Sequence, residues 1–185
     1  MTDQERSQRF QDTMLPHLHA AYNLARWLTR SDGDAQDVVQ EAYLRAFRYF
    51  DAFHGHDGRS WLLAIVRNTY YSGAKQHEHE LREVQFDEDH LSADEIAEIH
   101  AHFGGDNDPA AILQRGDESR RVHRALERVP TAFREVLILR ELEDLSYREI
   151  ADIAGIPVGT VMSRLARGRK LLAAYLLERE ACHGL

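Results

Sequence analysis

The residues with the clearest chemical potential lie in a short basic segment near the C-terminus. After the turn Gly-Ile-Pro, residues 158–172 carry four cations and no acid, although the whole chain has a formal net charge of −8. Apolar residues at steps of three and four predict a helix that buries Val161, Leu165, Gly168 and Leu172. Its outward face holds Thr160, Ser163, Arg164 and Arg167, with Arg169 and Lys170 flanking it. Because these side chains bind phosphates and base edges, this face is a candidate DNA-binding surface.

Local signals just before this helix predict the element that positions it. Ser146 and Glu149 have the spacing of a capping box, so a short helix is expected to begin there. Gly155 fits a left-handed helix end, and Pro157 suits the first turn of the next helix. Two helices joined by a short turn containing glycine form a helix-turn-helix, whose second helix can lie in the major groove. The alternative is an amphipathic helix pair with a solvated basic face.

Apolar spacing predicts helices in the rest of the chain as well, so the fold class is all-α. In the N-terminal part, three helices would bury Leu15, Leu18, Tyr22 and Ala25; then Val38, Val39, Ala42, Tyr43, Ala46, Phe47 and Phe50; then Trp61, Leu62, Ile65, Val66 and Thr69. Two further helices would precede the helix-turn-helix, one through Val122, Ala125, Leu126 and Val129 and one through Phe133, Val136 and Leu137. Ser31 and Thr131 are expected to cap the helices that follow them.

Charge divides the chain into three parts. Residues 1–75, 76–118 and 119–185 carry net charges of 0, −11 and +3, so the middle part supplies all of the excess acid. This middle part contains Gly104-Gly105 and Asp108-Pro109 and has no long apolar period, which predicts an acidic linker with at most a short helix at 92–102. We therefore expect two small helical domains, 1–75 and 119–185, joined by an acidic linker, 76–118.

Composition excludes several classes of protein. No apolar run approaches the ~20 residues of a membrane span, and the first ten residues are polar, so we expect a cytoplasmic protein without direct membrane insertion. The single cysteine, Cys182, allows no internal disulfide. We find no glycine-rich phosphate loop and no nucleophile with a matching base, so we expect neither an enzyme nor a cofactor.

Four segments resemble one known family. The stretch LSYREIADIAGIPVGTVMSRLARGRKLL is similar to the minus-35-binding helix-turn-helix of extracytoplasmic-function (ECF) sigma factors, small members of the bacterial sigma-70 family. The stretch ALERVPTAFREVLILRELEDLSYREIA is similar to the run that leads into it. DAQDVVQEAYLRAF resembles the core-polymerase-binding helix of the family, and RSWLLAIVRN resembles its minus-10 helix. The resemblance covers roughly residues 10–75 and 119–175, in the family's order.

The resemblance implies a sigma factor that binds core RNA polymerase, directs it to promoter DNA and is controlled by an anti-sigma factor. The implied core-polymerase-binding residues are Asp37, Gln40, Glu41, Leu44 and Arg45. The implied minus-10 DNA-binding residues are Phe53, Arg59, Arg67 and Asn68, and the basic face described above is the implied minus-35 reader. One departure concerns TYYSGAKQHEHE, where many relatives have an arginine-rich run and this chain has only Lys75. Tyr70 and Tyr71 can replace those contacts or pack in the core.

Two other functions stay open at this point. A helix-turn-helix regulator with a ligand- or partner-binding N-terminal domain would require a dimer and a palindromic site, whereas a sigma factor is active as a monomer. A metal-responsive protein would use the pairs His17/His19, His54/His56, His77/His79 and His100/His102. Residues two apart share a face only on a strand, and these pairs fall on predicted helices or loops, so we expect no metal site.

Overall fold

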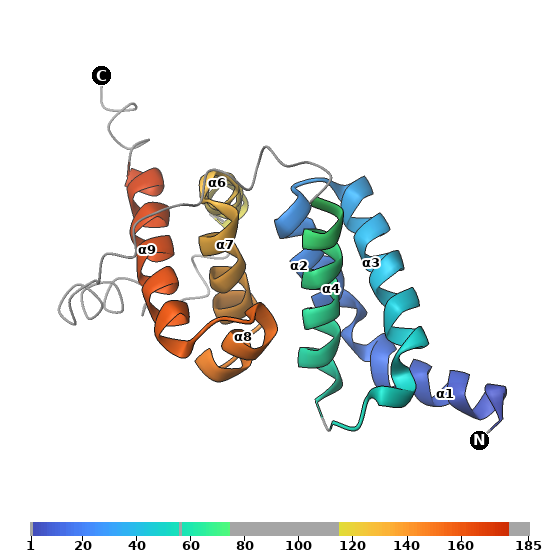
Figure 1. Ribbon diagram of the computed structural model, residues 1–185. Helices are drawn as coiled ribbons and strands as arrows, with labels where there is room; N and C mark the ends of the chain where they lie inside the picture. Colours follow the sequence, from blue (N-terminus) through green and yellow to red (C-terminus); the bar gives the residue numbers. More distant parts are fainter. Residues whose placement is uncertain (1, 56, 75–114, 178–185) are drawn as a thin grey trace.

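The computed structural model describes residues 2–55, 57–74 and 115–177, and every regular element within these ranges is a helix. Figure 1 shows two helical groups side by side, α1–α4 and α6–α9, which we call the N-terminal bundle and the C-terminal bundle. The all-α prediction is confirmed. The expected linker, 76–118, and its short helix at 92–102 lie outside the described residues, except for 115–118, where α6 has already begun.

The N-terminal bundle is built around three mutually packed helices, α2, α3 and α4. Its elements are α1 (Asp3–Met14), a 3-10 turn (Leu15–His17), α2 (Leu18–Thr29), α3 (Asp32–Arg48), a second 3-10 turn (Phe50–Ala52) and α4 (Gly58–Ala74). The predicted cap at Ser31 is confirmed, because its side chain accepts a hydrogen bond from the Asp34 N–H. Leu24 of α2, Leu62 and Val66 of α4 and Ala42 of α3 are fully buried in its core.

The start of this bundle differs from the sequence prediction. The chain forms a separate helix, α1, which ends at Met14, and Pro16 lies in the 3-10 turn that follows. The predicted burial of Leu15 and Leu18 is wrong, since both side chains are exposed. The turn changes the helical phase, so that α2 begins at Leu18 and buries a different face: Ala20, Ala21, Leu24, Ala25, Trp27 and Leu28.

The C-terminal bundle contains the predicted helix-turn-helix, formed by α8 (Tyr147–Ala154) and α9 (Val158–Leu177). It is preceded by α6 (Arg115–Arg128), α7 (Thr131–Leu137) and a π-helical turn, η5 (Ile138–Leu142). Ser146 and Glu149 form the expected capping box, and Gly155 ends α8 with a φ of 65°. The predicted cap at Thr131 is wrong: Pro130 holds the cap position of α7, and no side chain caps the helix.

One glycine brings the second helix of this motif close to α7. A Cβ atom at Gly168 would lie 3.0 Å from Leu137 Cδ1 and 3.3 Å from the Phe133 carbonyl oxygen. Both distances are shorter than ordinary van der Waals contact, so the helices can approach this closely because position 168 has no side chain. The residues predicted to face inward, Val161, Leu165, Gly168 and Leu172, are all buried.

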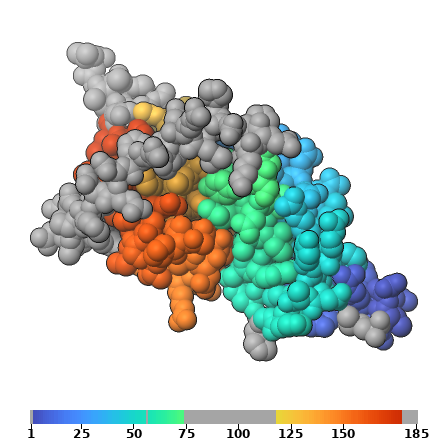
Figure 2. Space-filling model, viewed as in Figure 1, coloured from blue at the N-terminus to red at the C-terminus, as the bar shows by residue number. Residues whose placement is uncertain are grey.

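The two bundles are in direct contact. Residues of α2 and α4 pack against α7, η5 and α8, with α4 against α8 as the largest of these contacts. Figure 2 shows the surface of α4 meeting the surface of the C-terminal bundle. The first helix of the helix-turn-helix therefore lies against the helix that contains Arg59 and Arg67.

Candidate nucleic-acid interface

Most of the predicted basic face lies at the surface of α9. Thr160, Ser163, Arg164 and Arg167 are partly exposed, and Lys170 is exposed. The Ser163 hydroxyl donates to the Thr160 carbonyl oxygen at 3.1 Å, which keeps the first turns of the helix compact. A recognition helix enters the major groove of DNA by its N-terminal end. Short side chains there let the backbone come close to the bases, and the cations further along can contact phosphates.

Arg169 departs from this arrangement. Its side chain is only 7% exposed, and its Nε donates to Glu141 Oε1 of η5 at 3.0 Å. Position 169 follows the inward-facing Gly168 by one residue, about 100° around the helix, and therefore points toward η5 rather than outward. The sequence predicts that Arg169 flanks the DNA-binding face, whereas its side chain is buried and its described contact is within the bundle.

Two apolar residues on the first turns of α9 were missed by the sequence analysis. Val158 and Met162 are both exposed, four residues apart and therefore on one face of the helix. Apolar side chains in a groove contact the thymine methyl group, so they belong to the candidate reading surface. The spacing in the sequence would have placed Val158 in the buried stripe, since it lies three residues before Val161 and seven before Leu165, so its exposure is visible only in the structure.

The face of α3 predicted to bind core polymerase is open to solvent. Asp37, Gln40 and Glu41 are exposed, and Leu44 is 58% exposed although it is a large apolar residue. Arg45 is partly buried and its Nε lies 2.8 Å from Glu41 Oε1. This surface combines an exposed leucine with polar neighbours, a composition that fits a reversible protein interface.

The predicted minus-10 residues do not form one open surface. Asn68 is exposed on α4. Phe53 is buried, with its ring centroid 6.1 Å from that of Phe50 and 4.9 Å from that of Trp61. In this state Phe53 is a core residue, and Arg59 and Arg67 make contacts with the other bundle.

Arg59 is bound to the loop that follows η5. Its Nη2 donates to the Glu143 carboxylate at 2.5 Å and to the Glu143 carbonyl oxygen at 2.7 Å. The second carboxylate oxygen of Glu143 accepts from Asn23 of α2 at 2.9 Å. Glu143 is buried, and both of its carboxylate oxygens are hydrogen-bonded to the N-terminal bundle.

Arg67 is paired with a second buried carboxylate. Its Nε donates to Glu135 of α7, whose side chain is 0% exposed. The Tyr71 hydroxyl also lies 3.3 Å from Glu135, and the Arg67 guanidinium lies 4.5 Å from the centroid of the Tyr71 ring. Burial raises the pKa of Glu135, with Arg67 and Arg164 acting in the opposite direction. Burial also raises the pKa of Tyr71, which keeps the phenol protonated as a donor to Glu135.

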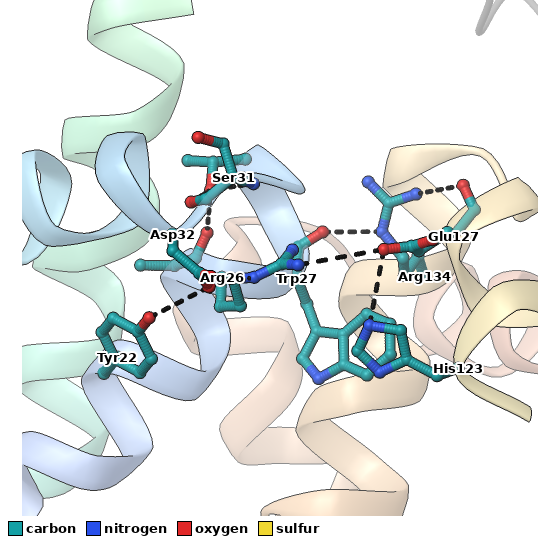
Figure 3. A network of polar contacts seen from close by, with 10 residues as sticks. Tyr22, Arg26, Trp27, Ser31, Asp32, His123, Glu127 and Arg134 are labelled. Atoms are coloured by element: carbon teal, nitrogen blue, oxygen red, sulfur yellow. Dashed lines mark hydrogen bonds and ion pairs between the residues drawn. The ribbon is translucent and has the colours of Figure 1, made fainter. Parts of the chain in front are cut away.

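A third contact between the bundles was not anticipated from the sequence. Arg134 of α7 is fully buried, and its Nε donates to the Trp27 carbonyl oxygen at 2.8 Å, at the end of α2 (Figure 3). Its Nη1 donates to the Val129 carbonyl at 2.8 Å within the same bundle. Figure 3 also shows the Trp27 and His123 rings beside one another, with centroids 4.4 Å apart.

Other candidate sites find no support in the described ranges. Residues 2–55, 57–74 and 115–177 contain no group of three or more His, Cys, Asp or Glu side chains that could hold a metal. Of the histidine pairs, His17/His19 and His54 are described, whereas the partners at 56, 77, 79, 100 and 102 lie outside these residues, as does Cys182. None of the described helices is both long enough and apolar enough to cross a membrane.

Comparison with protein families gives two matches in separate parts of the chain. A model described as sigma-70 region 2 matches residues 14–80, and one described as sigma-70 region 4 matches residues 119–172. Among curated proteins, the RNA polymerase sigma-H factor of Pseudomonas aeruginosa is 34% identical over 177 residues, 91% of this chain and 87% of that protein. The ECF RNA polymerase sigma-E factor of Escherichia coli K12 is 36% identical over 143 residues, 76% of this chain and 72% of that protein.

Two solved structures have a similar fold. The sigma factor RpoE of Bartonella quintana, in complex with the anti-sigma factor NepR, aligns with a TM-score of 0.66 at 26% identity, covering 92% of this chain and 98% of that chain. CnrH, in complex with the cytosolic domain of CnrY, aligns with a TM-score of 0.59 at 26% identity, covering 94% of this chain and 90% of that chain.

Proposed function

The chain belongs to the sigma-70 family of RNA polymerase sigma factors, in its ECF group, and we propose which of its surfaces carry out the steps of promoter-specific initiation. In this proposal the protein is a binding subunit rather than an enzyme. It acts as a monomer in the cytoplasm, where RNA polymerase is, and uses no cofactor. The observation that supports it most is the pair of region matches, which fall in family order on two different bundles.

Core RNA polymerase would bind the exposed face of α3, through Asp37, Gln40, Glu41, Leu44 and Arg45. Leu44 supports this assignment, because its 58% exposed side chain gives a polar helix face an apolar contact point for a partner. The polar neighbours would make the interface reversible, which a factor that leaves the polymerase after initiation requires.

The minus-35 element would bind the outward face of α9. Thr160, Ser163, Arg164, Arg167 and Lys170 supply donors for phosphates and base edges, and Val158 and Met162 supply apolar contacts. Arg169 would act indirectly, by fixing η5 against α9 through Glu141. The minus-10 element would bind α4 through Arg59, Arg67 and Asn68, with Phe53 joining only if the loop around it rearranges.

An anti-sigma factor is the remaining partner. Two solved structures with a similar fold each contain a second protein: the sigma factor RpoE is in complex with the anti-sigma factor NepR, and CnrH is in complex with the cytosolic domain of CnrY. Each covers more than nine tenths of this chain. We propose by analogy that this chain is also held inactive by a protein that engages both bundles.

The function is tested by transcription with purified components. The protein is mixed with core RNA polymerase that lacks any sigma factor, a fragmented genome of the source organism is transcribed, and the RNA starts are sequenced. Discrete starts with shared minus-35 and minus-10 sequences support the proposal. If a folded protein and an active polymerase give no starts, while the protein forms a dimer on palindromic DNA, the helix-turn-helix regulator is the correct function.

A variant separates DNA reading from polymerase binding. Arg164→Ala combined with Arg167→Ala should abolish promoter-dependent starts and leave binding to core polymerase intact. The charge-matched control, Arg9→Ala combined with Arg120→Ala, removes one exposed cation of α1 and one of α6 and should transcribe normally. Equal loss in both variants would attribute the effect to net charge rather than to the face of α9.

A further inference from the structure

The first helix of the chain lies ahead of the segment that matches sigma-70 region 2. That match begins at residue 14, whereas α1 spans Asp3–Met14. Figure 1 shows α1 at the outer end of the N-terminal bundle, on the side away from the C-terminal bundle. A polar helix of 12 residues is marginal on its own in water, so contacts with the rest of the bundle must hold it in place.

One arginine of α1 binds both the end of α3 and the 3-10 turn that follows it. The Nη2 of Arg6 donates to the Phe47 carbonyl oxygen at 2.7 Å, and its Nε donates to Asp51 Oδ1 at 3.0 Å. Its guanidinium also lies 4.6 Å from the centroid of the Phe47 ring. The carbonyl groups of a last helical turn lack their usual partner within the helix, and a cation is favourable there. Arg6 therefore ties α1 to the stretch of chain that leads into Phe53.

Aromatic contacts connect α1 to the same stretch. The Phe10 ring is nearly perpendicular to three others, at centroid distances of 5.1 Å from Phe47, 5.2 Å from Phe50 and 6.2 Å from Tyr43. Edge-to-face contact is a favoured arrangement of aromatic rings. Because the Phe50 ring lies in turn 6.1 Å from that of Phe53, a line of ring contacts runs from α1 to a residue assigned to the minus-10 element.

The start of α4 also lies against α1. A Cβ atom at Gly58, the first residue of α4, would lie 3.2 Å from Thr13 Cγ2, so the two backbones approach closely here. The Tyr43 hydroxyl donates to the Met14 carbonyl oxygen at 2.9 Å, which fixes the C-terminal end of α1 on α3. The helix thus contacts the chain on both sides of Phe53, at the 3-10 turn before it and at the start of α4 after it.

We propose that α1 positions the minus-10 surface, and that Arg6 is the residue through which it acts. The helix holds the chain in place on both sides of Phe53, so that a local change at Phe53 can bring its ring to a DNA base. Aromatic side chains bind unpaired bases by stacking on them. This proposal rests on the minus-10 role given to Phe53 above.

Fixed flanks make base binding by Phe53 more favourable. Flanks that are already ordered lose little conformational freedom when the ring stacks on a base, whereas free flanks must be ordered at that moment. Ordering one or two side chains on binding lowers the affinity about two- to tenfold. Removal of the Arg6 contacts should therefore weaken only the part of DNA binding that depends on the base at Phe53.

The test measures DNA binding by holoenzyme, formed from core RNA polymerase and the full chain. The probe is a fluorescently labelled single strand with the minus-10 sequence obtained from the transcription test, compared with strands that each lack one base. The position that Phe53 contacts is the one where loss of the base weakens binding by the wild type but not by Phe53→Leu, which keeps an apolar side chain in the core. For that position, Arg6→Ala should bind the complete strand about two- to tenfold more weakly than the wild type, and the abasic strand equally well.

The matched control is Arg9→Ala, which removes the same charge from the same helix. Arg9 lies 5.6 Å from the centroid of the Phe50 ring but does not bind the carbonyl and the carboxylate that Arg6 holds. This control should bind both strands as the wild type does. A charge exchange adds a rescue: Asp51→Arg should recover part of the base dependence that is lost in Arg6→Glu, because it restores the ion pair in reverse.

A second measurement follows the same part of the chain without DNA. Trp61 lies beside Phe53, with ring centroids 4.9 Å apart, and Trp27→Phe leaves Trp61 as the only tryptophan of the chain. Adding Arg6→Ala to this background should make the Trp61 fluorescence more readily quenched by acrylamide, with the circular dichroism spectrum unchanged. Unchanged quenching would mean that Arg6 does not hold this part of the chain, and it would overturn the proposal.

The binding results can overturn the proposal in three ways. Equal weakening of both strands in Arg6→Ala would mean that α1 supports the whole fold rather than the Phe53 contact. Unchanged binding of both strands would mean that α1 has no part in base binding. If no position distinguishes the wild type from Phe53→Leu, the minus-10 role of Phe53 is wrong and the positioning role falls with it, although discrete transcription starts would still support the sigma function.

Discussion

Replacing Gly168 by alanine should destabilise the C-terminal bundle, although alanine has a higher intrinsic helix propensity than glycine. The new Cβ would lie 3.0 and 3.1 Å from two carbons of Leu137, which is buried, and 3.3 Å from the Phe133 carbonyl oxygen. Overpacking of this kind costs about 1–3 kcal/mol, and the better helix propensity of alanine returns about 1 kcal/mol. The expected net loss is about 1 kcal/mol in the free energy of unfolding.

The measurement is urea unfolding followed by far-UV circular dichroism, which reports the helices of both bundles. Gly33→Ala is the matched control, because it is a helical glycine with nothing within 4 Å of the added Cβ. It should leave stability unchanged or raise it by up to about 1 kcal/mol. If Gly168→Ala is as stable as Gly33→Ala, the close approach of α9 to α7 is not what requires glycine, and the reasoning is refuted.

Three further predictions concern a helix cap, an exposed helix face and an ion pair. Ser146→Ala should cost about 1 kcal/mol in thermal unfolding at pH 7, through loss of the α8 capping box. Hydrogen bonds from Ser146 lower the pKa of Glu149 in the folded chain. The capping box therefore adds its full stability above the ordinary glutamate pKa of 4.5 and loses it as the pH falls through the lowered folded-state pKa. The stability lost in Ser146→Ala should shrink over the same fall in pH. Leu44→Ala with Gln40→Ala should weaken core-polymerase binding in a pull-down and leave the circular dichroism spectrum unchanged; a lost spectrum would mean that the pair is structural. Arg169→Ala removes the ion pair to Glu141 of η5, so it should lower thermal stability. The DNA affinity of the folded chain should be unchanged. A reduced DNA affinity in fully folded protein would instead assign Arg169 to the DNA-binding face.

The parts of the fold that depend on neighbouring residues could be predicted from the sequence. The capping box at Ser146, the left-handed Gly155 and the inward spacing of Val161, Leu165 and Gly168 are all present as expected. Each is determined within one or two turns of helix, where hydrogen bonds and side-chain direction depend on local spacing. The resemblance to ECF sigma factors rests on this segment and on two helices of the N-terminal bundle, and it is confirmed by the sigma-70 region matches together with the curated ECF relatives.

The errors arise where the local pattern is interrupted. Leu15 and Leu18 were assigned to one buried face with Tyr22 because their spacing continues a helical period across Pro16. The 3-10 turn there has about three residues per turn rather than 3.6, so the period does not carry through. Thr131 was assigned as a cap on residue type alone, yet its hydroxyl accepts a hydrogen bond from the buried Arg134 instead.

The contacts between the bundles could not be predicted from the sequence, for a physical reason. Arg67 and Glu135 lie 68 residues apart, and Arg59 and Glu143 lie 84 apart, so no helical period relates them. The features that suggest DNA contact in an arginine are its charge and its fork of donors, and these are equally satisfied by a carboxylate. A sequence therefore identifies a cation suited to an anion without identifying which anion it meets. For Arg59 and Arg67 the anion that the structure shows is a glutamate carboxylate of the other bundle.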